Sequence, residues 1–156
     1  MRAVIWISEN TWEACVDHAR ELVGADAEVT LLHVAPSDVE ELATRSAARL
    51  LGRRPPPPPG PPLRAIAAEE AEALLEAARD RLGRPAAIDS RRGNVEREVL
   101  AACGDADLLV LARDGEARVG PHSLGPRTRF VLDHAACQVL LVWAVALSPG
   151  NRAPPD

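Results

Sequence analysis

The sequence contains no lysine and no tyrosine, and its aromatic residues are one phenylalanine and three tryptophans. The missing lysine excludes a phosphate-binding loop of the GK[ST] type and Schiff-base catalysis, because both need an amine. The shortage of aromatic rings argues against single-stranded nucleic-acid binding, which stacks bases on such rings. All 18 basic residues are arginine, but 23 acidic residues leave a net charge of −5. We therefore expect no nucleic-acid partner.

Long apolar runs are also absent. No run approaches the roughly 18 residues of a membrane span, and MRAVIWISEN turns polar too soon for a signal peptide, so we expect no membrane partner. The three cysteines are odd in number and form no CxxC pair, which favours a reduced, cytoplasmic protein. The four histidines have no metal-ligand spacing, so no metal site is expected, and His33 and His134 are interpreted as structural.

Short apolar runs alternate with amphipathic segments along most of the chain. The expected strands are residues 3–7, 28–34, 85–89, 108–112 and 137–145. The expected helices are 9–24, 37–52, 67–83, 94–103 and 127–135, with Asn10, Ser37 and Asn94 as caps. Alternating buried strands and helices predict an α/β fold, a single doubly wound (Rossmann-like) domain over residues 1–147 with a five-stranded parallel sheet.

Proline is concentrated in one place, because seven prolines lie within residues 55–62. Such a run cannot form the interior of a helix or a sheet, so residues 52–64 are predicted to be an extended, Pro-rich insertion loop. A stiff surface connection is the favoured interpretation, and docking of an unknown protein partner through this loop is the alternative. The tail, residues 148–156, is predicted to be disordered.

Doubly wound sheets bind ligands beyond the carboxyl ends of their strands, where the strand order reverses. The loops at residues 8–10 and 112–128 are therefore the candidate ligand loops. In the second loop, Gly125 precedes Pro126 and a helix start, with the Thr128 hydroxyl close by. Exposed N–H groups at a helix start favour anions. Spacing alone nevertheless favours an ordinary Gly-rich connection over a phosphate loop.

The final third of the chain resembles the universal stress protein family, whose members carry Gly-x2-Gly-x9-Gly-Ser/Thr after the fourth strand. Gly115 and Gly125 match the second and third glycines of that motif. The run HAACQVLLV (134–142) is similar to the family's HAPCPVLVV ending, and LLHV (31–34) and GNVEREVLAA (93–102) are similar to its upstream segments. The resemblance implies the strand order 3-2-1-4-5.

The resemblance also implies a homodimer. Residues 137–145 would then form an edge strand that is strongly apolar and lacks Lys, Glu or Pro to guard it. An antiparallel pairing with its copy is expected to bury Val142, Trp143 or Val145 against the partner.

A nucleotide site is implied as well, at Ser8, Val34, Ala112, Arg113, Gly115, Gly125, Arg127 and Thr128. The chain departs from the family pattern at three places. Ala112 replaces the first glycine, Pro126 replaces the hydroxyl residue, and the family's Asp after the first strand is missing, with Ser8 or Glu9 nearest its place. We therefore expect ATP or AMP to bind weakly or not at all. Three arginines are candidates for partial compensation on the phosphate side: Arg113, Arg127 and Arg129.

The expected function is that of a non-enzymatic, stress-related regulatory or binding protein. One alternative is an ATP-binding protein or slow nucleotide hydrolase that uses the same cleft, and another is an interaction module that docks through the Pro-rich loop. His122 and Ser123 are the only polar pair near the presumed site, and no GxSxG elbow accompanies them. We therefore expect no catalytic residues.

Overall fold

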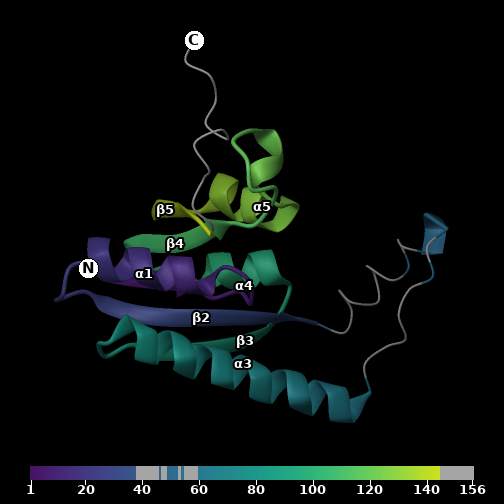
Figure 1. The fold of residues 1–156 in the computed structure, drawn as a ribbon, viewed down its shortest axis with the longest axis horizontal. Coiled ribbons are helices and arrows are strands. Elements are labelled where there is room, and N and C mark those ends of the chain that lie inside the picture. Colours follow the sequence, from purple (N-terminus) through teal and green to yellow (C-terminus); the bar gives the residue numbers. More distant parts are fainter. Residues whose placement is uncertain (38–45, 47–48, 53, 55–59, 145–156) are drawn as a thin grey trace.

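The computed structural model describes residues 1–37, 46, 49–52, 54 and 60–144. Five parallel strands form one sheet: β1 (Arg2–Trp6), β2 (Glu28–Pro36), β3 (Ala87–Gly93), β4 (Leu108–Arg113) and β5 (Gln138–Trp143). The strand order is β3-β2-β1-β4-β5 (Figure 1). This confirms the doubly wound α/β prediction, including the order 3-2-1-4-5.

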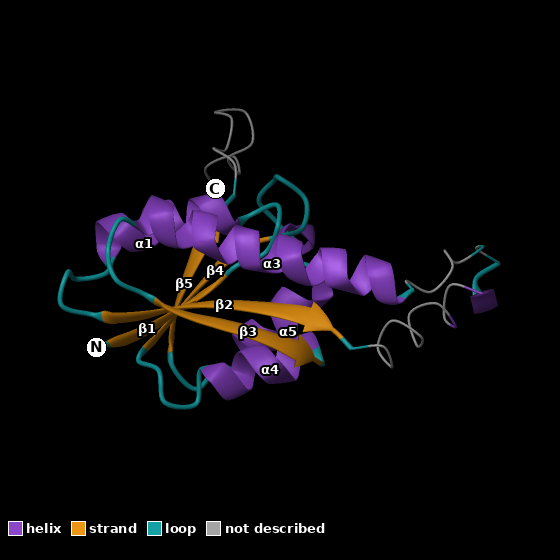
Figure 2. Ribbon diagram, turned by 90° about the horizontal axis from the view of Figure 1, so that it is seen from below, coloured by secondary structure: helices purple, strands orange, loops and turns teal. Residues whose placement is uncertain are grey.

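Helices cover both faces of the sheet. The helices α1 (Trp12–Leu22) and α3 (Pro61–Leu82) lie on one face, and α4 (Val95–Ala102) and α5 (Pro126–His134) lie on the other (Figure 2). Each face has its own core, as β1 illustrates: Ile5 packs in one cluster and Val4 in the other. Both faces of the strand are thus buried, which explains its unbroken apolar run.

Some element boundaries differ from the predictions. The cap of α1 is Thr11, not Asn10, and no side-chain hydrogen bond caps that helix. The cap of α4 is confirmed, because the Asn94 side chain accepts a hydrogen bond from the Arg97 N–H at 3.1 Å. The third strand was predicted at residues 85–89 but spans Ala87–Gly93. It is an edge strand with an alternating exposed pattern, and its arginines hid it from a search for apolar runs.

The start of α3 corrects the predicted insertion loop. Gly60 is the N-cap and Pro61 and Pro62 open the helix, so residues 61–64 are helical. The first N–H groups of a helix need no intrahelical partner, and the fixed φ of proline suits that turn. The helix ends at Gly83 (φ 70°), as predicted. Most of the helix predicted at 37–52, the prolines at 55–59 and the tail at 148–156 lie outside the described residues.

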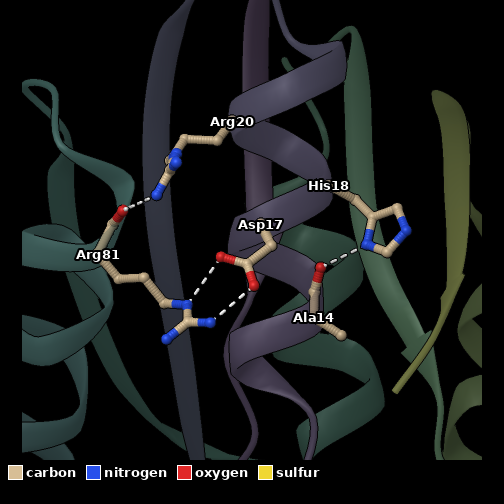
Figure 3. Close-up of polar contacts among 5 residues, drawn as sticks. All are labelled: Ala14, Asp17, His18, Arg20 and Arg81. Carbon is tan, nitrogen blue, oxygen red and sulfur yellow. Dashed lines mark hydrogen bonds and ion pairs between the residues drawn. The ribbon is translucent and has the colours of Figure 1, made fainter. Parts of the chain in front are cut away.

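A surface ion pair joins α1 to α3 (Figure 3). The Arg81 guanidinium donates two hydrogen bonds, at 2.8 and 2.7 Å, to the Asp17 carboxylate. Arg20 donates to the Arg81 carbonyl at 3.2 Å. These contacts link α3 to α1, which starts directly after the turn that follows β1. Among the described residues, no helix is long and apolar enough to cross a membrane.

Candidate functional site

A cleft of about 350 Å³ opens at the carboxyl ends of β1, β2 and β4. It lies where the strand order reverses, between β1 and β4, as the doubly wound fold predicts. The turn after β1, the end of β2 and the first residues of α4 and α5 contribute to it. Its walls are formed by Trp6, Ile7, Ser8, Glu9, Asn10, Thr11, His33, Val34, Pro36, Val95, Asp114 and Arg127.

The end of β2 offers its backbone to this cleft. The Ile7 N–H donates to the Leu32 carbonyl at 2.8 Å, and the Ser37 N–H donates to the Gly93 carbonyl of β3 at 3.1 Å. Backbone groups along a strand alternate between its two neighbours, so Val34 turns its N–H and C=O to the same side as Leu32. The strand β1 ends at Trp6, opposite Leu32. The Val34 donor and acceptor therefore face the cleft.

The turn after β1 forms the polar rim. The Ser8 carbonyl accepts hydrogen bonds from the N–H groups of Thr11 and Trp12, at 3.1 and 3.0 Å, which begins α1. The Ser8 side chain is half-buried, and those of Glu9 and Asn10 are exposed. This turn takes the place where the family resemblance calls for an Asp, and it presents a hydroxyl, a carboxylate and an amide to a ligand.

His33 belongs to the cleft as well, although the sequence suggested a structural role. Its Nδ1 is buried and has no hydrogen-bond partner among the described residues. Burial lowers the pKa of His33 below its ordinary value, against the opposing charge of Glu9. The place of His33 at the carboxyl end of a buried strand was the signal that could have revealed it.

On the β4 side, the Arg113 side chain contacts other residues of the protein. Its Nη1 donates to the Ser123 Oγ at 2.5 Å, and its guanidinium lies 4.7 Å from the centroid of the Trp143 ring. Ser123 is buried, and its hydroxyl donates to the Gly120 carbonyl at 2.8 Å. Arg113 is therefore turned toward β5 and is not among the residues that line the cleft. The Ser123 hydroxyl is likewise committed within the loop rather than presented as a nucleophile beside His122.

The two glycines that match the family motif, Gly115 and Gly125, make contacts within the loop itself. A Cβ on Gly115 would stand 2.2 Å from the His122 carbonyl oxygen, a distance that no side chain tolerates. The Gly115 N–H donates to the Ser123 carbonyl at 3.1 Å, so the loop folds back onto its own backbone. At the other end, the Gly125 N–H donates to Asp114 Oδ1 at 2.7 Å.

The predicted site residues therefore divide into two groups. Three of them line the cleft: Ser8, Val34 and Arg127. Five are not among the residues that form its walls: Ala112, Arg113, Gly115, Gly125 and Thr128. Ala112 and Thr128 are buried, at 6% and 2% exposure. Sequence reasoning missed Asp114, whose signal was a carboxylate just after the buried strand β4.

Comparison with solved structures identifies the fold family that this chain resembles. No family model matches the sequence, and no curated protein matches it. Solved structures do match. A universal stress protein in complex with cAMP superposes with a TM-score of 0.61 at 15% identity, covering 93% of this chain and 98% of its own. The chain has the fold of the universal stress proteins.

Two further structures agree with that assignment. The universal stress protein from Archaeoglobus fulgidus matches with a TM-score of 0.61 at 16% identity, covering 90% of this chain and 97% of its own. A universal stress protein family protein from Arabidopsis thaliana, with AMP bound, matches with a TM-score of 0.56 at 15% identity, over 92% and 91% of the two chains. At these identities the likeness is one of fold.

Proposed function

We propose that this protein is a non-enzymatic regulatory module of the universal stress type that holds an adenine nucleoside or nucleotide in the cleft. The observation that carries the proposal is the backbone of Val34, whose N–H and C=O face the cleft beyond the end of β1. One donor and one acceptor on a rigid strand can pair with the edge of a purine base. Structures of the same fold hold cAMP and AMP, which supports this ligand class.

Binding of ATP is proposed to be weak. The departures from the family motif, Ala112 and Pro126, lie on the side where phosphates would bind. Arg113, an expected phosphate ligand, bonds Ser123 instead. Few donors on that side are left to offset the desolvation of a triphosphate. The affinity then comes mainly from the base and the sugar.

A binding role is proposed in preference to hydrolysis. The Ser123 hydroxyl is bonded within its own loop. Within the described part of the chain, no group of three His, Cys, Asp or Glu side chains could hold a metal ion. The proposal of a binding role therefore rests on the Ser123 hydroxyl, which is already committed to contacts within the chain. The alternative of docking through the Pro-rich loop concerns residues that lie largely outside those described.

Isothermal titration calorimetry tests the proposal with adenosine and Mg-ATP. We expect a dissociation constant for Mg-ATP of about 10 µM to 1 mM. Ser8→Trp, which fills the cleft, should abolish binding of both ligands. Ser46→Trp, at an exposed position outside the cleft, is the matched control and should leave binding unchanged. A submicromolar constant for Mg-ATP, or no heat with either ligand, would contradict the proposal.

We also propose self-association through β5 and a cytoplasmic setting. The Gln138 N–H donates to the Asp107 carbonyl at 3.1 Å, so the backbone groups of every second residue, counted from Gln138, face β4. Leu141 lies between two such residues, so its N–H points to the free edge of β5. Val142 is only 4% exposed and belongs to the core, so Leu141 and Trp143 take its expected place in the proposed interface, and Val145 lies outside the described residues. The three cysteines are free, which suits a reducing compartment.

A further inference from the structure

Asp114 follows β4 and reaches across its loop to the start of α5. Its Oδ1 accepts a hydrogen bond from the Gly125 N–H at 2.7 Å, and the residue also lines the cleft. A Cβ on Gly125 would stand 2.8 and 3.0 Å from the two carboxylate oxygens, so this carboxylate is packed against the glycine. At this helix start, one N–H that a bound anion could use is therefore already taken by a side chain of the protein itself.

Two further backbone donors of this loop are also bonded within the chain. The Gly115 N–H donates to the Ser123 carbonyl at 3.1 Å, and the Glu116 N–H donates to the His122 carbonyl at 2.8 Å. Pro126, the first residue of α5, has no N–H to donate. A phosphate that used the N–H groups of Gly115, Glu116 or Gly125 would therefore have to break an existing hydrogen bond.

The charges around the cleft oppose an anion as well. Among the described residues that line it, Glu9 and Asp114 contribute two carboxylates and Arg127 contributes one guanidinium. A phosphate monoester carries close to two negative charges at neutral pH, and partial removal of water strengthens its repulsion by a nearby carboxylate. An uncharged nucleoside meets no such repulsion and can still use the Val34 backbone.

We propose that Asp114 sets the charge class of the ligand, so that the cleft prefers an uncharged nucleoside to the corresponding nucleotide. Asp114 is then a specificity-determining residue that occupies the phosphate position. This inference rests on the proposed function, because it assumes that a purine compound binds in the cleft. Ala112 and Pro126 would weaken phosphate binding by removing contacts, whereas Asp114 would weaken it by adding a repulsive charge.

The test compares adenosine with AMP by calorimetry at low ionic strength. Wild-type protein should bind adenosine more tightly than AMP. Asp114→Asn keeps an oxygen to accept the Gly125 N–H but removes the charge, so it should raise AMP affinity by about tenfold and change adenosine affinity by less than about twofold. Asp133→Asn, an exposed residue of α5 outside the cleft, makes the same charge change and should alter neither. Added salt should narrow the wild-type preference.

Each of the other outcomes contradicts either the role of Asp114 or the proposed function. If wild-type protein binds AMP as tightly as adenosine, the proposed function stands and the role of Asp114 falls, with no variant needed. If Asp114→Asn shifts both ligands equally, or if Asp133→Asn matches it, Asp114 does not select by charge. If neither ligand binds to any of the proteins, the proposed function fails and the inference fails with it.

Discussion

The two halves of the sheet on either side of β1 differ in how their backbone hydrogen-bonding groups are used. In the β2–β3 half, β2 runs past the end of β1 and leaves the Val34 backbone facing the cleft. In the β4–β5 half, the loop after β4 closes on itself through Gly115 and its N–H donors bond its own carbonyls. The same fold thus leaves the backbone of Val34 facing the cleft on one side, whereas several backbone donors on the other side bond within their own loop.

The outer edges of the two halves differ as well. The β3 edge is polar, and Arg91 pairs there with Asp89 at 2.9 Å. The β5 edge is apolar, with half-buried Val139 and Leu141. Charged side chains discourage pairing of a strand with another chain, whereas apolar edges invite it. The proposed self-association thus uses the half of the sheet whose loop after β4 is bonded internally.

The largest expected effect follows from substituting Leu141 by proline. This change removes the N–H that faces the free edge of β5, and it should raise the dimer dissociation constant by about 100-fold or more. Leu141→Ala keeps the N–H and should dimerise more weakly than wild type but detectably. Sedimentation velocity measures both, and circular dichroism checks that the fold persists. A wild-type protein that is monomeric at high micromolar concentration would contradict the proposal that the β5 edge, unlike the β3 edge, pairs with another chain.

The next effect concerns the loop after β4. Gly115→Ala places a Cβ 2.2 Å from the His122 carbonyl oxygen and should lower the free energy of unfolding by about 2–4 kcal/mol. Gly104→Ala is the control, because its nearest neighbour would be an ordinary 3.4 Å away, and it should change that free energy by less than about 1 kcal/mol. Urea denaturation compares them. Equal stability of the two variants would show that the loop is not closed in this way.

A smaller effect is expected where the loop after β4 meets β5. Arg113→Met removes the hydrogen bond to buried Ser123 and the contact with Trp143, at an expected cost of about 1–2 kcal/mol. Arg97→Met, at an exposed position of α4, should cost less than about 0.5 kcal/mol. The same urea experiment applies. An unchanged AMP affinity in Arg113→Met is also expected, and a large loss would instead identify Arg113 as a phosphate ligand.

The smallest effect is expected at the ion pair between α1 and α3. Hydrogen bonding to Arg81 lowers the pKa of Asp17, so the native state binds that proton less readily than the unfolded state. The contribution is present above the ordinary carboxylate pKa and is lost as the pH falls through the lowered one. Asp17→Asn should lower Tm at pH 7 by about 1 °C or less, since the pair is exposed. The difference should vanish near pH 2. A difference that grows in acid would contradict the pairing.

The fold could be predicted because burial leaves a plain pattern. The run from Ala3 to Ile7 is apolar without a break because its side chains pack alternately into two cores. The third strand was misplaced because an edge strand needs no such run. The start of α3 was missed because the rule against proline in helices does not apply to the first turn, where Pro61 lies.

The site was harder to predict, because its key contacts join residues that are distant in sequence. The motif located Gly115 and Gly125, but their partners, the His122 carbonyl and the Asp114 carboxylate, emerge only when the loop is folded. No local pattern marks such a closure. Val34 was predicted through the resemblance, and the register of β2 beyond β1 supplies its physical reason.

The most direct test of the central claim is to map a bound nucleoside by amide chemical shifts in ¹⁵N-labelled protein. With adenosine, the account predicts that the amide signals of Val34 and Thr11 move, because the ligand lies on the wall of β1 and β2. The signals of Gly115 and Gly125 should stay in place, because their N–H groups are bonded within the chain. Shifts centred on those two glycines, with Val34 unmoved, would contradict the account.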